Sequence, residues 1–286
     1  AAGGAGRAAT GGGAGGAAGG AAANALGIPT SGDTSHCVEG RQFSPKIDNW
    51  APPCIPKFTG KNPGPTYQGV TADTIKIIDY VGKGNSALDA ILQAQGAYVY
   101  DDQRNAFNSQ VAKFISKNYE LYGRKVEIKA VQGQCESVPP DYRCLRNEVR
   151  EIIAREKPFA IKWNTSLASP FFAEASAQKV INVGGWHFRD SFNKAWAPYH
   201  YDVQISGTQQ VRQWAEWYCN QLNGKKAIYA GDPAIQQKTR ILGVISTNDP
   251  ENKKTIQIDL KAALAECGTS YEHAYSYAQD LATAHQ

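Results

Sequence analysis

A chain of 286 residues, 42% of them hydrophobic, can bury a sizeable core and is long enough for two folded units. Its net charge of +4 comes from lysines and arginines spread along the chain, which argues against the concentrated basic stripe of a nucleic-acid binder. No stretch approaches the roughly 18 apolar residues of a membrane helix, so the sequence predicts no membrane-spanning segment.

Residues 1–34 are a low-complexity tract. Only Arg7 and Thr10 among the first 23 residues are neither alanine nor glycine, and the chain contains no methionine. Such a tract buries too little apolar surface to offset its ordering entropy, which is typical of a flexible tether. We interpret the missing methionine as removal of a leading segment, which suits a secreted or surface-anchored protein. A tail on a cloned fragment fits the same residues.

Residues 35–68 are rich in proline, glycine, asparagine and lysine, so we expect an irregular lead-in with a disulfide. The six cysteines form three neighbouring couples: Cys37 with Cys54, Cys135 with Cys144, and Cys219 with Cys267. They show no CxxC or zinc spacing, and sequential disulfides are one hypothesis among several connectivities. Disulfides indicate an oxidising compartment, whereas six buried free thiols would fit a cytosolic protein.

Residues 69–204 alternate short β-branched runs with longer segments of helical period. The expected strands are Ile75–Val81, Lys125–Val131, Phe159–Trp163 and Val180–Val183. The expected helices are Asn105–Tyr122, Leu145–Arg155 and Ser169–Gln178, and Trp196–Ile205 is expected to leave the sheet in an extended form. Strands joined by such helices make right-handed crossovers, so the sequence predicts an α/β segment with parallel strands flanked by helices.

The long connection Lys83–Gln103 has the pattern of one short helix, and long connections over a ligand-binding edge are often lids. Asp101 and Asp102 within it are interpreted as a helix cap, with a pair of catalytic carboxylates as the alternative.

Residues 205–286 repeat the alternation over a shorter length. The expected helices are Gly207–Asn223 and Asn252–Glu266, and a further helical pattern begins at Ala278–His285. The expected strands are Lys226–Ala230, Ile241–Ser246 and Tyr271–Tyr277. Two or three strands leave an exposed sheet edge, so we expect this second α/β segment to be incomplete.

Open parallel sheets bind ligands in the crevice at the carboxyl ends of their strands. Here those ends carry Trp163-Asn164-Thr165-Ser166 and Gly184-Gly185-Trp186. The helix that follows Ser166 presents its N-terminus, whose unpaired N–H groups are suited to a carboxylate.

Several stretches resemble the type 1 periplasmic substrate-binding proteins of ABC transporters, in the Leu/Ile/Val-binding group. GVTADTIKI resembles the opening strand of that family, and LYGRKVEIKAVQGQC its helix end and second strand. REIIAREKPFAIKWNTSLASPFFAEASAQKVINVGGW resembles its helix, strand, serine-bearing loop, helix and strand, and RILGVIST the start of its second lobe. The resemblance covers about residues 66–286, and APPC resembles the lead-in of actinobacterial lipoprotein-like members.

The resemblance implies a type 1 periplasmic-binding-protein fold, with two α/β lobes joined by three crossing segments. Only the first crossing, near Tyr199–Ile205, has a counterpart, so the chain matches a C-terminally truncated member. The resemblance implies an extracytoplasmic protein, membrane-anchored only through a tether or a lipid anchor outside this chain. Such a protein captures an amino acid, or a larger apolar or aromatic acid, and hands it to an ABC transporter permease.

Family members hold the ligand with loops after the first-lobe strands, and the resemblance carries this role to Ser166, with Asn164 and Thr165 beside it. Capping of the next helix is the alternative role of these hydroxyl groups. His187, Tyr199 and Tyr201 are further candidates for hydrogen bonds to a ligand.

Gly184 and Gly185 allow a close backbone approach to a ligand, and a plain strand-end turn is the alternative. Trp163 and Trp186 would supply flat apolar walls for a ligand larger than leucine, unless they pack against the sheet edge.

The sequence predicts no enzyme, no metal site and no cofactor, because it lacks the GxSxG, GxxxxGK[ST], GxGxxG and HExxH motifs in their required contexts. Two other functions fit the same residues. One is a ligand-sensing regulatory module that docks to a signalling partner. The other is a fragmentary surface interaction domain.

Overall fold

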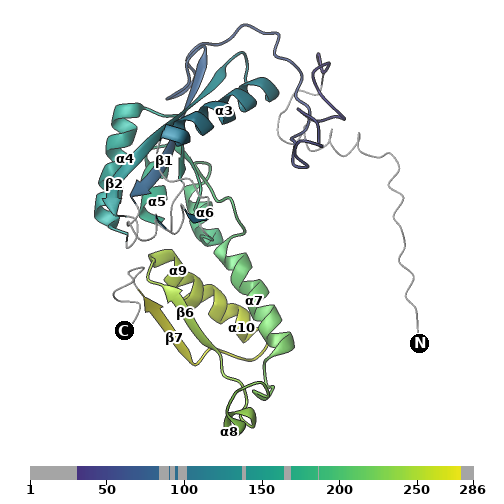
Figure 1. The fold of residues 1–286 in the computed structure, drawn as a ribbon, viewed down its shortest axis with the longest axis vertical. Helices are drawn as coiled ribbons and strands as arrows, with labels where there is room; N and C mark the ends of the chain where they lie inside the picture. Colours follow the sequence, from purple (N-terminus) through teal and green to yellow (C-terminus); the bar gives the residue numbers. More distant parts are fainter. Residues whose placement is uncertain are drawn as a thin grey trace, which may run out of the picture. The chain divides into compact units, whose positions relative to one another are not determined.

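A computed structural model describes residues 31–83, 90, 94–95, 102–136, 140–163, 169–185 and 187–277 (Figure 1). The chain forms two compact units that interleave in sequence. The lead-in unit comprises Ala1–Thr66, Thr71–Thr74 and Val111–Val126, and the main unit comprises Tyr67–Val70, Ile75–Gln110 and Glu127–Gln286. The predicted boundary between residues 204 and 205 is not a border of these units and stays a prediction.

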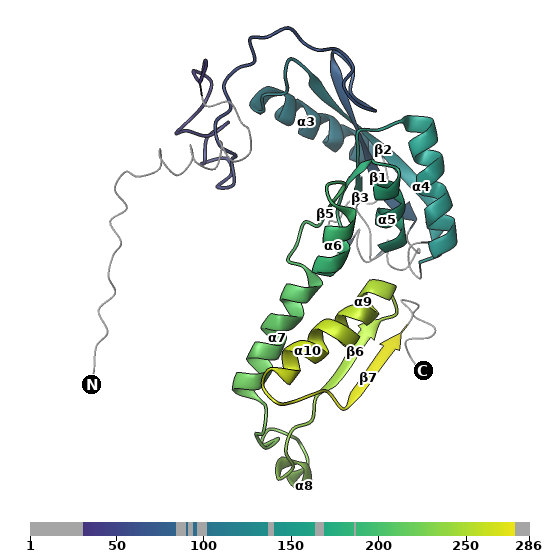
Figure 2. The same ribbon diagram turned by 180° about the vertical axis from the view of Figure 1, so that it is seen from behind.

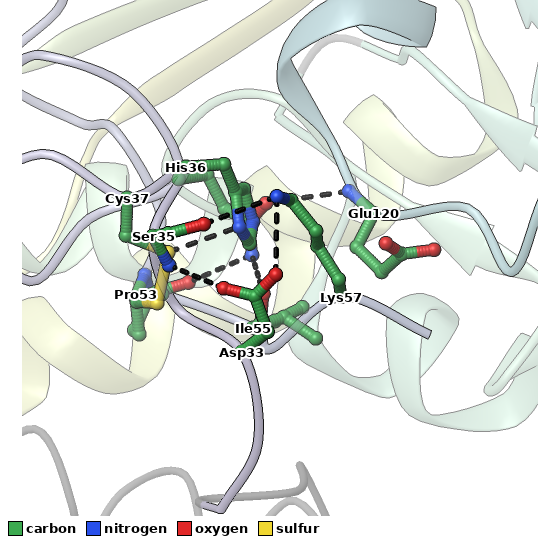
Figure 3. The surroundings of a disulfide bond; sticks show 10 residues. Asp33, Ser35, His36, Cys37, Pro53, Ile55, Lys57 and Glu120 are labelled. Atoms are coloured by element: carbon green, nitrogen blue, oxygen red, sulfur yellow. Dashed lines mark hydrogen bonds and ion pairs between the residues drawn. A yellow bond between two sulfur atoms is a disulfide. The ribbon is translucent and has the colours of Figure 1, made fainter. Parts of the chain in front are cut away.

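The lead-in unit contains an irregular loop that is held by a disulfide and by polar contacts. A disulfide joins Cys37 to Cys54. Lys57 donates to Ser35 Oγ at 3.1 Å and forms an ion pair with Asp33 at 3.1 Å (Figure 3). A segment without regular secondary structure thus acquires a defined conformation from a covalent link and polar contacts.

Aromatic rings attach this loop to the helix and turn that complete the lead-in unit. The ring of Phe43, 4% exposed, lies 5.3 Å from that of Phe114 and 5.5 Å from that of Tyr119. The rings of Phe58 and Tyr122 meet edge to face at 5.2 Å. Such pairs bury apolar area in favourable ring geometry, so the lead-in has a small aromatic core.

The main unit contains a five-stranded sheet in the order β2-β1-β3-β4-β5, with β3 parallel to β1, β4 parallel to β3 and β5 parallel to β4. The strands are β1 (Thr74–Lys83), β2 (Lys125–Glu136), β3 (Ala160–Trp163), β4 (Ile181–Val183) and β5 (His200–Tyr201). The helices between them are α3 (Asp102–Asn118), α4 (Tyr142–Glu156), α5 (Ser169–Ala177) and α6 (Asp190–Trp196). The predicted α/β architecture is confirmed.

The two faces of β1 differ in chemistry. Ile78 and Tyr80 are fully buried in a first hydrophobic core that also contains residues of α4 and α5, which lie beside the sheet in Figures 1 and 2. Asp79 points to the other face because side chains alternate along a strand. The buried part of β1 therefore contains one carboxylate among largely apolar side chains.

Asp79 is matched by charge and hydrogen bonds from α3. Arg104 donates to both of its oxygens, at 2.5 and 2.9 Å, and Asn108 donates at 2.9 Å. Burial raises the pKa of Asp79, but the hydrogen bonds from Arg104 and Asn108 outweigh burial and hold the pKa below its ordinary value. The first turns of α3 are therefore fixed to the sheet by a buried bidentate ion pair.

A second core lies C-terminal to the five-stranded sheet. It is built by α7 (Gly207–Gln221), by β6 (Gly243–Thr247) pairing in parallel with β7 (His273–Tyr277), and by a helical segment, residues 250–265. That segment consists of α9 (Pro250–Lys254), a π-helical stretch (Thr255–Leu260) and α10 (Lys261–Ala265). Val211, Leu260 and Leu264 are buried in this core.

The structure corrects one expected strand. Lys226–Ala230 is not a strand: only a bridge from Lys226 to Thr239 is present, and the short helix α8 (Pro233–Gln236) follows. Gly231, Asp232 and Pro233 explain this, because the Asp232 carboxylate accepts the Ala234 N–H at 2.8 Å and starts a helix.

Two short elements were missed: α6, which ends where the expected extended passage Trp196–Ile205 begins, and β5, which lies within that passage. Asp190–Trp196 forms α6, and His200–Tyr201 forms the fifth strand of the sheet. Both are too short for a periodic pattern to emerge. The helical patterns expected at Ala278–His285 and around residues 88–95 lie, wholly or mostly, outside the described residues.

All six cysteines are joined in sequential couples, with separations of 17, 9 and 48 residues for Cys37–Cys54, Cys135–Cys144 and Cys219–Cys267. Cys219–Cys267 links the end of α7 to the residues just after α10, and Cys219 packs against the second core.

Replacing Cys219 and Cys267 together by serine should lower the free energy of unfolding by about 4 kcal/mol, because the bridge closes the longest loop. The matched change of Cys135 and Cys144 should cost less, about 2.5 kcal/mol. Urea unfolding of both variants checks this, and an equal or reversed order would contradict the loop-length argument.

Candidate functional site

The order of the first sheet defines where its ligand crevice should lie. The chain moves from β1 outward to β2 and then back across to β3, so the connections after β1 and β3 leave toward opposite faces. In sheets of this order, the crevice opens at that reversal, outside the carboxyl ends of the strands. β1 ends at Lys83, β3 at Trp163 and β4 at Val183.

The residues predicted to bind a ligand fall in two groups. Gly184, Gly185, His187 and Tyr201 are described, and of Trp163 only the backbone in β3 is described. Asn164, Thr165, Ser166 and Trp186 lie outside the described residues. Tyr201 is 52% exposed and its carbonyl oxygen accepts the Gly184 N–H at 3.0 Å, which ties the turn after β4 to β5.

The turn after β4 requires glycine. Gly184 and Gly185 have φ values of 144° and 94°, a region that side chains disfavour. A Cβ on Gly185 would lie 2.8 Å from the ring of Phe188. The chain therefore approaches the first core closely before it reaches His187.

His187 connects this turn to the beginning of α7. Its Nδ1 lies 2.7 Å from the carbonyl oxygen of Ile205, which can only accept, so Nδ1 carries the proton and donates. Its Nε2 lies 3.2 Å from the Gln210 amide nitrogen and accepts from it. These two contacts fix the orientation of the imidazole ring between the turn after β4 and α7.

Gly207 lets α7 start against this loop. Its N–H donates to the Phe188 carbonyl oxygen at 2.9 Å, and a Cβ there would lie 2.2 Å from the His187 carbonyl oxygen. Ser206 caps the helix by accepting the Gln209 N–H at 3.2 Å. Only glycine permits this approach of the two backbones.

An ion pair holds the same region to the second core. Arg189 donates to both oxygens of Asp259, at 2.7 and 3.0 Å, and Thr208 donates to Asp259 at 3.1 Å. Burial raises the pKa of Asp259, but the hydrogen bonds from Arg189 and Thr208 hold it below its ordinary value. The chain that leads from the first sheet into α7 is therefore held to the second core by Arg189, before α7, and by Thr208, within it.

A cavity of about 290 Å³ lies between His187, the start of α7 and the carboxyl ends of β6 and β7. Its polar lining consists of His187, Gln210, Ser246, Thr247, Asn252, Thr255 and Tyr277. Its apolar lining consists of Val211, Trp214, Val244, Ile245 and Ile256. A small cavity with apolar walls and a few convergent polar groups is the usual form of a small-molecule site.

Sequence reasoning found only His187 among these lining residues. Thr247 and Tyr277 end β6 and β7, so the rule that placed the first crevice at strand ends would have found them too. Gln210 and Asn252 carry no such signal, because their place depends on how α7 and α9 pack.

Asp249 joins the starts of two helices. One oxygen accepts the N–H groups of Glu251 and Asn252 at 2.8 and 3.4 Å, which caps α9. The other oxygen accepts the hydroxyl of Ser169, the first residue of α5, at 3.2 Å. Burial raises the pKa of Asp249 above its ordinary value, although hydrogen bonds from Glu251, Asn252 and Ser169 act in the opposite direction.

The carboxylate of Asp249 also faces a tyrosine of α4. Tyr142 has a buried hydroxyl, and burial, followed by the charge of Asp249, raises its pKa to about 12. The helix N-terminus that the sequence marked as a carboxylate site therefore already faces a carboxylate of the chain itself.

A buried histidine of β5, His200, packs beside the turn after β4. His200 donates from Nδ1 to Asn182 Oδ1 at 2.6 Å and is 4% exposed, and its Nε2 has no hydrogen-bond partner among the described residues. The rings of Phe172, Phe188 and Phe192 surround it at 5.2 to 5.6 Å. Burial lowers the pKa of His200 to about 4.

A larger groove, about 920 Å³, is lined in part by residues of α7 and β6, and it shares Trp214, Val244 and Ile245 with the smaller cavity. Its lining includes Trp214, Trp217, Ile235, Ile241, Leu242 and Ile245. Trp217 is 60% exposed and Ile245 74% exposed, which is unusual for large apolar side chains in one patch.

Within the described ranges, no group of three or more histidine, cysteine or acidic side chains could hold a metal ion. The helices of the same ranges also include none with the length and apolar character to cross a membrane.

Replacing Gly185 by alanine should destabilise the protein by more than about 1 kcal/mol, because the residue has a positive φ and no room for a Cβ. Gly231 is the matched control, since a Cβ there meets nothing within 4 Å and its φ is not in the left-handed region. Gly231→Ala should leave stability equal or slightly higher. Equal losses in urea unfolding would contradict the geometry.

His200 should make stability depend on pH. Its pKa is about 6.5 unfolded and about 4 folded, so the folded state binds fewer protons. Stability should be full above pH 6.5 and fall by about 3 kcal/mol as the pH drops to 4.

The variant His200→Gln keeps a donor for Asn182 and should flatten this slope in urea unfolding between pH 7 and 4. Exposed His273→Gln should keep the slope, and a slope that survives His200→Gln would assign the effect to another group.

No protein-family profile matches this chain, and no curated protein matches it. Solved structures do resemble it. One is a possible leucine/isoleucine/valine-binding protein from Rhodopirellula baltica, 13% identical, TM-score 0.46, covering 72% of this chain and 49% of that one. Another is an ABC transporter solute-binding protein from R. palustris in complex with 4-hydroxybenzoate, 15% identical, TM-score 0.46, covering 71% and 46%.

A third is an ABC transporter substrate-binding protein from Desulfitobacterium hafniense in complex with Leu, 11% identical, TM-score 0.44, covering 72% of this chain and 51% of that one. The chain thus spans about half the length of these structures. The protein has an α/β fold of parallel strands flanked by helices, and the solved structures that it resembles are type 1 periplasmic solute-binding proteins of ABC transporters.

Proposed function

We propose that this protein is an extracytoplasmic solute-binding protein that captures a small organic molecule and delivers it to the permease of an ABC importer. The observation that carries the proposal is the cavity beside His187. It lies where the carboxyl ends of β6 and β7 meet the loop that follows β4 of the first sheet. A crevice shared by strand ends of two sheets is where α/β proteins bind ligands.

The proposed ligand contacts on the first sheet are the two loops after β3 and β4. The residues that we propose as contacts after β3 are Trp163, Asn164, Thr165 and Ser166, and those after β4 are Gly184, Gly185, Trp186 and His187. The strand order supports this assignment, since β3 lies beside the reversal of the sheet and β4 is its neighbour. Tyr201 remains a proposed contact from β5, on the exposed side of the turn.

A solute-binding protein of this kind acts by closing around its ligand and needs no catalytic residue. The ligand binds more tightly when both lobes contact it, so binding shifts the protein toward its closed form, and the permease recognises that form. Export is supported by the three disulfides, because such bonds persist in oxidising compartments. Membrane anchoring, through a tether or a lipid anchor outside this chain, is part of the proposal.

A surface interaction domain is a second candidate, and the apolar groove beside β6 favours it. An interaction domain would use Trp217 and Ile245 to bind another protein and would need no small molecule. Trp217 lines the groove but not the cavity, so loss of a partner with Trp217→Lys, together with no small-molecule binding by the unmodified chain, would support this candidate over the first.

The purified full chain should release a small organic molecule on denaturation, detected by mass spectrometry, because a solute-binding site retains its ligand through purification when dissociation is slow. Adding that molecule back to ligand-free protein should change the tryptophan fluorescence. The change should shrink in the double variant W163F/W186F.

Trp50 provides the matched control, because it is 90% exposed and belongs to the lead-in unit. The W50F variant should keep the full ligand-induced change. Trp214 also lines the cavity and should keep part of the change. A change of undiminished size in W163F/W186F would remove Trp163 and Trp186 from the site, and absence of any bound or binding molecule would overturn the proposed function.

A further inference from the structure

The groove of about 920 Å³ has two walls that run beside each other. One wall is α7, from Trp214 to Leu222, and the other is the continuous stretch 238–245, which includes the start of β6. The Arg240 N–H donates to the Lys225 carbonyl oxygen at 3.0 Å, so this stretch begins beside the residues that follow α7. Both walls lead to α8 at this end, as Figures 1 and 2 show.

The opposite end of the groove adjoins the smaller cavity, because Trp214 and Ile245 line both spaces. The helix between Trp214 and Leu222 rises about 12 Å. The chain between Arg240 and Ile245 spans up to about 16 Å. Apolar side chains such as Trp217 line this length, so the groove suits an elongated apolar ligand better than a compact one.

The end of the groove beside α8 is basic. Lys238 and Arg240 line it, and Lys225 and Lys226 lie next to them through backbone hydrogen bonds. Lys225 and Lys226 donate to uncharged oxygen atoms, and none of the four side chains forms an ion pair within the described ranges. The described lining of the groove contains no acidic residue, and the nearby Asp232 is engaged in capping α8.

A carboxylate on a linear apolar chain complements both parts of the groove. The guanidinium group of Arg240 can hold a carboxylate through two parallel hydrogen bonds, and Lys238 adds a second positive charge. A chain of about ten to twelve carbon atoms reaches about 11 to 14 Å, which matches the distance between the two ends. The apolar chain would be removed from water while the carboxylate stays at the basic, open end.

We propose that the groove between α7 and β6 binds a free medium-chain fatty acid, with its chain along α7 and its carboxylate at Lys238 and Arg240. This site is additional to the cavity of the proposed function, with which it shares only Trp214, Val244 and Ile245.

Three compounds test the site: decanoate, the uncharged analogue 1-decanol, and the short acid butyrate. Binding to the full chain is measured by isothermal titration calorimetry at pH 7 and low ionic strength, with each compound kept monomeric. Decanoate should bind about tenfold or more tightly than 1-decanol, because only its headgroup is an anion that pairs with the two cations. Butyrate should bind at least about a hundredfold more weakly than decanoate, because it lacks most of the apolar chain.

The double variant K238Q/R240Q separates charge from apolar contact. It should bring decanoate to within about threefold of 1-decanol and leave the binding of 1-decanol unchanged. The matched control is K225Q/K226Q, which removes the same charge beside the groove from residues that do not line it. This control should keep a preference of about fivefold or more. Trp217→Ala should weaken decanoate and 1-decanol alike, because Trp217 contributes only apolar wall.

Equal binding of decanoate and 1-decanol would overturn the inference, and so would a preference that K238Q/R240Q leaves unchanged. Binding to phosphatidylglycerol vesicles without binding of free decanoate would overturn it in favour of a membrane contact. Self-association that Trp217→Ala abolishes, with no binding of decanoate, would overturn it in favour of an interface between copies of the chain.

The proposed function can fail or hold separately, because Lys238 and Arg240 do not line the cavity. A molecule that is released on denaturation and still binds K238Q/R240Q with full affinity supports the proposed function, whatever decanoate does. Binding of decanoate with the expected preference, and no other bound molecule, supports the groove alone.

Discussion

Burial on both faces of a parallel sheet is the constraint on which the rest of this structure depends. Parallel strands need crossovers, and the crossovers place helices over the sheet. The first core takes Ile78 and Tyr80 from one face of β1. The other face carries Asp79, whose burial is tolerated only because Arg104 and Asn108 of α3 supply charge and hydrogen bonds. The sheet order and the place of its reversal follow from how these helices are distributed.

The chemistry of the candidate site depends on this scaffold through close backbone approaches. Gly185 brings the turn after β4 onto the ring of Phe188, and Gly207 brings α7 onto the carbonyl group of His187. Arg189 and Thr208 then hold Asp259 of the helical segment. Two glycines and one ion pair therefore determine how closely the turn after β4 approaches the second core. The cavity lies between that turn and the ends of β6 and β7, so the same contacts determine the size of ligand that it can hold.

Three carboxylates show how environment decides the role of a residue type. Asp79 and Asp259 each meet an arginine in two hydrogen bonds, which keeps them charged and makes them structural anchors. Asp249 meets only neutral donors at helix starts, and burial raises its pKa. Its charge is therefore stabilised by neutral hydrogen-bond donors, the N–H groups that start α9 and the hydroxyl of Ser169.

Local patterns determined much of this protein from the sequence alone. The strand at Ile75–Val81, the helix at Leu145–Arg155 and the alternation that builds a parallel sheet all follow from side-chain periodicity, because burial of one face imposes that period. The site is less local. The glycine turn at Gly184 and Gly185 was visible in the sequence, but Gln210, Asn252 and Tyr277 come together only when α7, α9 and β7 pack. Short elements such as α6 and β5 are stabilised by neighbours and carry too few residues for a pattern. The engagement of Asp249 with Ser169, 80 residues away, is a tertiary contact between groups that no spacing in the sequence relates.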